Sequence, residues 1–191
     1  MDEQWAGSLA RRVVAGDREA FDELMKHFYP GLLRAAYLIA GNRADSEDIV
    51  QETFASCWIN RARIREPEHI GRWLYRSMTR EAWRVGRMSR REQPVEEVIS
   101  ENTPGRGSVL EEVVNTSGKQ ELFAAIAALP VKQRTVLVLY YYNEMSAKEI
   151  AAVTGCLEGT VKSRLFTARK NLKTALTKER AMGREALLRS S

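Results

Sequence analysis

The sequence predicts an all-α chain of two small helical domains joined by a flexible, acidic linker. Three observations support this prediction. Apolar residues recur at helical spacing through most of the chain. Two stretches rich in Lys and Arg flank an acidic one. The C-terminal third carries the residue spacing of a helix-turn-helix. We expect the first domain at residues 1–91, the linker at 92–117, the second domain at 118–178 and a C-terminal tail at 179–191.

The first domain is expected to contain four helices. Phe21, Leu24 and Phe28 share one face of a helix over residues 17–29. Pro30 fits the first position of a second helix, which continues to residue 40 and ends at Gly41. Asp45 is expected to cap the third helix. A loop over residues 60–68 then leads into a fourth helix at 70–88.

The fourth helix has an unusual row of positive charge. Arg72, Arg76, Arg80 and Arg84 fall at intervals of four residues, and Glu81 is the one acidic residue of that helix. Such a row is commonly a solvated face, but like charges on one face repel unless an anion meets them. Indole rings at Trp73 and Trp83 lie close to the row in sequence and can stack on unpaired bases. These residues favour a nucleic-acid surface.

Residues 92–117 have the composition of a linker, and two helices are expected after them. Residues 92–117 hold six Glu and one Arg, together with Pro94, Pro104, Gly105 and Gly107, which is typical of a linker. Two helices are expected after it, at residues 118–129 and 131–142, with Pro130 between them.

Residues 146–173 have the spacing of a helix-turn-helix whose second helix is suited to DNA. Ser146 and Glu149 form a capping box. Ala151 allows close helix approach, Gly155 suits the tight turn, and Val161 anchors the second helix. An ordinary helical hairpin is the alternative. Side chains able to meet phosphates or base edges follow the anchor, namely Lys162, Ser163, Arg164, Thr167, Arg169 and Lys170.

Together these segments resemble a sigma factor of the extracytoplasmic-function (ECF) group, within the sigma-70 family of bacterial RNA polymerase initiation subunits. The resemblance rests on GDREAFDELMKHFYPGLLRAAYLIAGNRADSEDIVQETFASCW, on GRWLYR, and on LPVKQRTVLVLYYYNEMSAKEIAAVTGCLEGTVKSRLFTARKNL. DSEDIVQETF and GTVKSRLFTARKNL are its most specific parts. It extends over nearly the whole chain.

The resemblance implies three binding surfaces and no catalysis. Core polymerase, through the clamp helices of its largest subunit, would bind Asp48, Ile49, Gln51, Glu52 and Phe54, with Phe54 as an apolar anchor. The −10 promoter element would be melted and held by Arg61, Arg63, Arg72, Trp73, Arg76, Arg80, Trp83 and Arg84. The −35 element would be read as duplex by Lys162, Ser163, Arg164, Phe166, Thr167, Arg169 and Lys170. The second domain would also contact the polymerase flap, and an anti-sigma factor would occlude these surfaces.

Other classes of function fit the sequence less well. A dimeric helix-turn-helix regulator would share the C-terminal half, but it explains neither DSEDIVQETF nor the arginine helix. An enzyme is disfavoured because His27 and His69, the only histidines, lie in separate elements without a nucleophile motif. We expect no cofactor and no metal. Neither a signal peptide nor a membrane span is expected, so the predicted location is the cytoplasm.

Overall fold

The computed structural model of this chain describes residues 3–92 and 117–189. Every regular element in these two ranges is a helix. The first range holds α1 (Glu3–Val14), α2 (Arg18–Ala40), α3 (Arg43–Ile59), the 3₁₀ turns η1 (Arg61–Arg63) and η2 (Pro67–His69), and α4 (Ile70–Glu92). The second holds α6 (Ser117–Ala127), α7 (Val131–Tyr141), α8 (Ala147–Thr154) and α9 (Glu158–Arg189). The predicted all-α fold is confirmed, while the predicted linker lies almost wholly outside the described residues.

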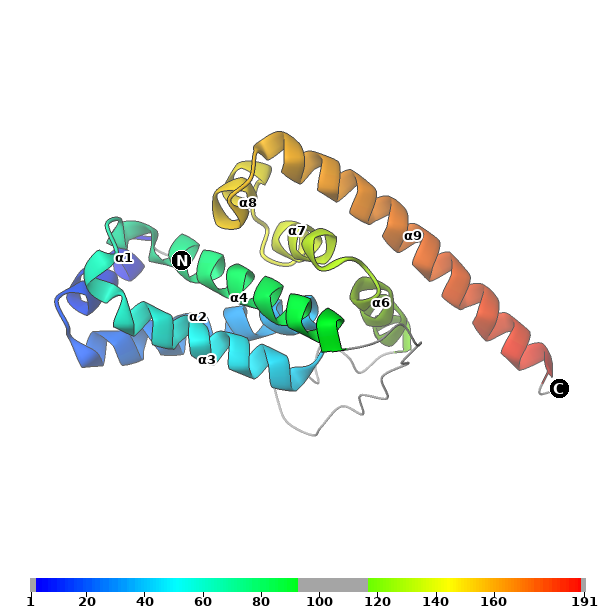
Figure 1. Cartoon of the computed structure of the whole chain (residues 1–191), viewed down its shortest axis with the longest axis horizontal. Coiled ribbons are helices and arrows are strands. Elements are labelled where there is room, and N and C mark those ends of the chain that lie inside the picture. The colour runs from blue at the N-terminus through cyan, green and yellow to red at the C-terminus, as the bar shows by residue number, and fades with distance from the viewer. Residues whose placement is uncertain (1–2, 93–116, 190–191) are drawn as a thin grey trace.

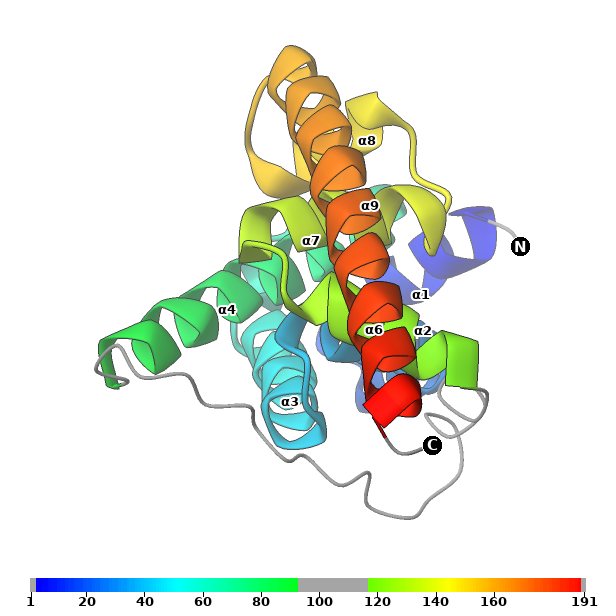
Figure 2. The ribbon, with the colours of Figure 1, turned by 90° about the vertical axis from the view of Figure 1, so that its right-hand side faces the viewer.

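The helices form two groups that lie side by side. Figure 1 shows α1–α4 as one bundle, with α6, α7 and α8 along one side of it and α9 projecting beyond both. Figure 2 shows α9 crossing over α7 and α6. No helix in the described ranges is both long and apolar enough to cross a membrane. Helix α9 runs without a break through the boundary at 178/179 that the sequence suggested.

Each group has its own apolar interior, and α7 contributes to both. Leu24, Leu32, Ile49 and Leu74 are fully or almost fully buried in the core of α1–α4, and Val138 of α7 belongs to that same cluster. A second cluster joins α7, α8 and α9 through Val136, Leu139, Ile150, Val153, Val161 and Leu165. A third, smaller cluster joins α6, α7 and α9. The two groups therefore share a packed boundary along α7.

The predicted break at Pro30 is wrong, because α2 continues through it as one helix. Pro30 is exposed, so its ring faces away from the core. Proline inside a helix costs about 3 kcal/mol. The residues on either side, Leu24 and Leu32, are completely buried, and each such side chain contributes roughly 1.5–3 kcal/mol. Burial on both sides of the proline thus offsets its cost.

The cap of α3 also differs from the prediction. Asn42 is the cap, and its Oδ1 accepts the backbone N–H of Asp45 at 2.8 Å. The Nδ2 of Asn42 donates back to Asp45 Oδ2 at 2.8 Å. Asp45 is therefore the third residue of the helix, where a carboxylate suits the positive end of the helix dipole.

Helix α1, which the sequence pattern did not predict, is fixed to α2 by polar contacts at the turn between them. Asp17 caps α2 by accepting the Ala20 N–H at 3.1 Å. Its carboxylate also pairs with the Arg12 guanidinium at 2.7 Å. The Ala20 hydrogen bond, with Arg12 second, holds the pKa of Asp17 below its usual value.

Candidate nucleic-acid interface

The arginine row of α4 lies along one wall of a groove between α3 and α4. The groove has a volume of about 510 Å³. Glu52 of α3 and Asn60, the residue just after that helix, lie on one side of it, and Trp73 of α4 on the other. The cationic side chains that line it are Arg63, Arg76, Arg80, Arg84 and Arg87, all of them exposed. A cationic groove with an aromatic ring in its wall is suited to a single nucleic-acid strand.

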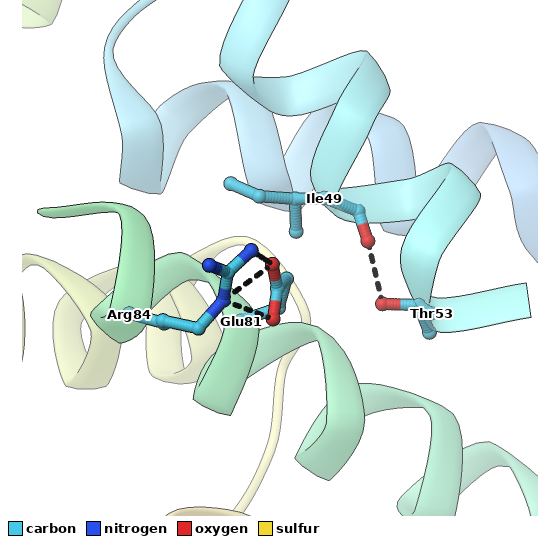
Figure 3. Close-up of polar contacts among 4 residues, drawn as sticks. All are labelled: Ile49, Thr53, Glu81 and Arg84. Carbon is cyan, nitrogen blue, oxygen red and sulfur yellow. Dashed lines mark hydrogen bonds and ion pairs between the residues drawn. The ribbon is translucent and has the colours of Figure 1, made fainter. Parts of the chain in front are cut away.

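One arginine of this row is held by a carboxylate from its own helix. Figure 3 shows Arg84 facing Glu81, and its Nε donates to both carboxylate oxygens at 3.0 Å. Glu81 raises the pKa of Arg84 above its usual value. Across the groove, the hydroxyl of Thr53 donates to the Ile49 carbonyl oxygen at 2.7 Å, so that hydroxyl is already satisfied.

The arginine row therefore has more acidic partners than the sequence suggested. Arg72 forms an ion pair with Glu66 of the preceding loop, a partner that helical spacing could not reveal. Among the residues that the structure describes, Arg76 and Arg80 have no ion pair within 4.0 Å. Within the row of Arg72, Arg76, Arg80 and Arg84, these two guanidinium groups are the ones without a carboxylate partner in the described part of the chain.

A second cavity adjoins the groove at the loop between α3 and α4. It has a volume of about 390 Å³. Trp73 and Arg76 line both cavities, so the two share a wall. The loop residues Arg63, Ile64, Arg65, Glu66 and His69 supply most of the rest.

Among the residues assigned to the −10 element, Arg72 lines only the second cavity, and Arg61 and Trp83 line neither cavity. Arg61 turns back on α3, where its guanidinium lies 4.3 Å from the centre of the Trp58 ring and its Nη1 donates to the Trp58 carbonyl at 2.7 Å. Trp83 faces α7, where its Nε1 donates to the hydroxyl of Thr135 at 3.0 Å. Both side chains have structural partners that sequence reasoning did not foresee.

The helix-turn-helix has the local geometry that its sequence predicted. The Ser146 hydroxyl accepts the Glu149 N–H at 3.3 Å, and the Glu149 carboxylate accepts the Ser146 N–H at 2.8 Å. This capping box is confirmed, and its hydrogen bonds lower the pKa of Glu149. Gly155 ends α8 with φ of 67°, a left-handed conformation that favours glycine. Val161 is completely buried against α7 and α8.

The first turns of α9 present polar and aromatic side chains to solvent. Lys162 is exposed and pairs with Glu158 at 2.7 Å. Phe166 is 72% exposed, so its ring is accessible from solvent. Arg164 is half-buried, with Nη1 3.6 Å from Cys156 Sγ. Ser163, Arg169 and Lys170 are also exposed, and Thr167 is half-buried.

Comparison with known proteins identifies both groups of helices. The model for Sigma-70 region 2 matches residues 24–93, and the model for Sigma-70 region 4 matches residues 119–172. The ECF RNA polymerase sigma-E factor of Escherichia coli is 30% identical over 174 residues, which cover 85% of this chain and 89% of that relative. The chain belongs to the ECF family of RNA polymerase sigma factors. It is thus a subunit that directs promoter-specific initiation of transcription.

Another ECF relative agrees in extent, and two solved structures agree in fold. The sigma factor SigW of Bacillus subtilis is 29% identical over 176 residues, covering 87% of this chain and 94% of SigW. A solved structure of CnrH in complex with the cytosolic domain of CnrY has a TM-score of 0.69 at 23% identity, covering 91% of this chain and 98% of CnrH. The sigma factor RpoE from Bartonella quintana, solved with the anti-sigma factor NepR, has a TM-score of 0.64 at 24% identity, covering 82% of this chain and 96% of that one.

Within this sigma factor, α3 presents a different face to solvent from the one the sequence suggested. Asp48, Gln51 and Glu52 are exposed, in keeping with a binding surface. Ile49 and Phe54 are only 1% and 4% exposed. Both side chains are packed in the core of region 2, so they are less accessible than the sequence suggested, and their assignment as contact residues stays a prediction.

An exposed apolar residue on α3 was missed. Ile59 is 74% exposed at the C-terminal end of the helix. It lies four residues after Ala55 and eleven after Asp48, which places it on the exposed face of α3. The sequence does indicate that Ile59 is exposed, because it falls outside the apolar stripe formed by Ile49, Val50, Phe54 and Cys57.

Proposed function

We propose that three exposed surfaces divide the work of initiation in this sigma factor. The groove between α3 and α4 binds the melted −10 strand, the first turns of α9 read the −35 duplex, and the exposed face of α3 binds core polymerase. The observation that carries the proposal is the presence, on one chain, of a cationic groove walled by Trp73 and of a helix-turn-helix with exposed Lys162 and Phe166. We place the first domain at residues 1–91 and the second at 118–178.

The −10 strand is assigned to the groove through its charge and its ring. Arg76 and Arg80 supply cations with no ion pair among the described residues, and Arg63 extends the charge to the loop. Trp73 stands between the groove and the loop cavity, where a flipped base can stack on it. Arg72 and Arg84 serve here too, although each must exchange a carboxylate for a phosphate.

The −35 duplex is assigned to α9 by the helix-turn-helix geometry. The second helix of such a motif enters the major groove with its N-terminal residues against base edges. Lys162, Ser163 and Arg164 occupy that position, and Phe166 offers an apolar contact to thymine methyl groups. Thr167, Arg169 and Lys170 lie further along and suit phosphates.

The polymerase surface on α3 combines carboxylates with an apolar residue. Asp48 and Glu52 suit basic residues of a coiled coil, and Gln51 lies between them in sequence. Ile59 supplies an apolar contact that is more accessible than Phe54.

Paired substitutions test this division of labour. Replacing Lys162 or Arg164 with Ala should weaken promoter-specific transcription by ~1–3 kcal/mol for a base contact, with binding to core polymerase unchanged. Asp48→Ala and Ile59→Ala should weaken core binding instead. Lys173→Ala, an exposed change further along α9, is the matched control. Loss of both activities in any one folded variant would contradict the proposal.

We further infer that an anti-sigma factor binds this chain, and that the chain acts in the cytoplasm without catalysing a reaction itself. Two observations support this inference. The chain belongs to the ECF family, and the similar sigma factor RpoE was solved in complex with the anti-sigma factor NepR. Such a partner would lie across both domains. Small-angle X-ray scattering with and without the candidate partner tests this, and an unchanged profile would count against it.

A further inference from the structure

A pair of exposed aromatic rings lies at the C-terminal end of α7, outside the three binding surfaces. Tyr140 and Tyr141 are 37% and 56% exposed, and their ring centres lie 5.0 Å apart at an interplanar angle of 75°. The guanidinium carbon of Arg169, on α9, lies 5.5 Å from the centre of each ring. Both distances are within the range of about 6 Å for a cation–π contact. One guanidinium group thus meets both tyrosine rings.

The position of Arg169 beside these rings is set by the packing of α9 on α7, which Figure 2 shows from the side where the two helices cross. Ala168, the preceding residue, is completely buried in the cluster that joins α6, α7 and α9. Two residues after Arg169, Asn171 donates through Nδ2 to Gln133 Oε1 of α7 at 2.9 Å. The backbone of Arg169 is therefore held on both sides, and its side chain begins next to the tyrosines.

The two rings also lie at the edge of the helix face that is assigned to the −35 duplex. Lys162, Phe166 and Arg169 are separated by four and three residues, which places them on one face of α9. All three side chains are exposed. Because the tyrosines contact Arg169, α7 contributes side chains to the border of this face.

Contact with an aromatic ring leaves the positive charge of an arginine uncompensated, unlike contact with a carboxylate. Lys162 pairs with Glu158 at 2.7 Å, whereas Arg169 has no carboxylate within 4.0 Å in the ranges that the structure describes. The ring faces attract the guanidinium through their quadrupole and carry no net charge. A side chain that is already held in place loses less rotamer freedom when it meets a phosphate. Arg169 is thus oriented and still fully charged.

We propose that Tyr140 and Tyr141 are positioning residues, which hold Arg169 for a phosphate of the −35 duplex. The inference rests on the function proposed above, and it adds α7 to the elements that support −35 binding. Phosphate contacts carry no sequence information by themselves. The tyrosine pair should therefore raise affinity for the duplex without changing which bases are preferred.

A double-mutant cycle tests this role in holoenzyme assembled from core polymerase and the full chain. The probe is a fluorescently labelled duplex from the promoter that run-off transcription maps, and binding of each variant to core polymerase is measured in parallel. The variants are Tyr140→Leu with Tyr141→Leu, the same pair changed to Phe, Arg169→Ala, and the leucine pair combined with Arg169→Ala. Tyr142→Leu is the matched control, because Tyr142 is 38% exposed and has no cation over its ring among the described side chains.

The expected losses differ between the ring and the charge. Arg169→Ala should weaken duplex binding about tenfold and make its salt dependence shallower by about one logarithmic unit per decade of salt, as for one phosphate. The leucine pair should weaken binding about three- to fivefold, and the phenylalanine pair should stay within about twofold of the wild type, because the ring holds the guanidinium. In the Arg169→Ala background the leucine pair should cause no further loss. Tyr142→Leu should bind as the wild type does.

Three results would overturn the proposal. A loss from the leucine pair that is equally large with and without Arg169 would mean that the rings act independently of the guanidinium. A phenylalanine pair as weak as the leucine pair would assign the effect to the hydroxyl groups. Weaker binding of the leucine pair to core polymerase would mean that the rings contact the polymerase instead.

The proposed function has a separate readout in the same assay. If Lys162→Ala bound the duplex as tightly as the wild type, the assignment of the −35 element to α9 would itself fail. A loss with Lys162→Ala, together with no effect of the leucine pair, would count against the positioning role alone.

Discussion

Arg134 offers the sharpest test of how the two domains are held together. Its guanidinium donates to three carbonyl oxygens, those of Ile39 at 2.7 Å, Ala127 at 2.6 Å and Leu129 at 3.0 Å. Two of these lie at the C-terminal ends of α2 and α6, where a cation also meets the negative end of each helix dipole. One side chain thus caps two helices from different domains.

Arg134→Met removes all three bonds and keeps an apolar stem. Hydrogen bonds from a charged donor contribute about 1.5–3 kcal/mol each, but water can reach part of this half-buried site. We therefore expect the free energy of unfolding to fall by about 3 kcal/mol, measured by urea titration with circular dichroism. Arg134→Lys should recover less than half, because one ammonium cannot reproduce the planar fork.

The matched control is Arg18→Met, an exposed arginine on α2. It should change the unfolding free energy by less than about 0.5 kcal/mol, as is usual for surface positions. An Arg134→Met loss no larger than that of the control would refute the reasoning, since it would mean that water replaces the guanidinium without cost.

Two further predictions concern backbone and pH. Glu144 has φ of 54°, a left-handed conformation unfavourable for a residue with a Cβ, so Glu144→Gly should raise the unfolding free energy by about 1 kcal/mol; a loss of stability in urea titration would contradict this. Asp17 and Glu149 have pKa values lowered in the folded chain, so the stability they contribute is present above their ordinary values of 3.8 and 4.5 and is lost as pH falls through the folded values. The double variant Asp17→Asn and Glu149→Gln should therefore unfold with a weaker pH dependence below pH 5 than the wild type, whereas parallel profiles would show that these carboxyls do not titrate as described.

Local signals explain why the helix-turn-helix could be predicted closely from sequence. Three features of the motif depend on residues that are close in sequence. They are its capping box, its left-handed glycine and its buried valine. Ser146, Gly155 and Val161 have the roles that their spacing indicated. The arginine row of α4 was predictable for the same reason, because a period of four residues fixes a helical face.

Features that depend on distant residues could not be predicted in this way. From the sequence alone, Pro30 is expected to begin a helix. Only the structure shows that Leu24 and Leu32, on either side of it, are both buried in one core. From the sequence alone, Phe54 is expected to be an exposed anchor. In the structure its ring lies among buried side chains, with its centre 6.3 Å from the centre of the Phe21 ring. Trp83 and Thr135 are 52 residues apart in sequence, and no periodicity within either helix indicates that they meet.

Run-off transcription tests the central claim most directly. Core polymerase, a promoter fragment and the purified chain are combined, and start sites are mapped with and without the chain. The account predicts initiation from discrete sites only when both the chain and core polymerase are present. Absence of initiation, together with tight binding of a palindromic duplex by the chain alone, would contradict it.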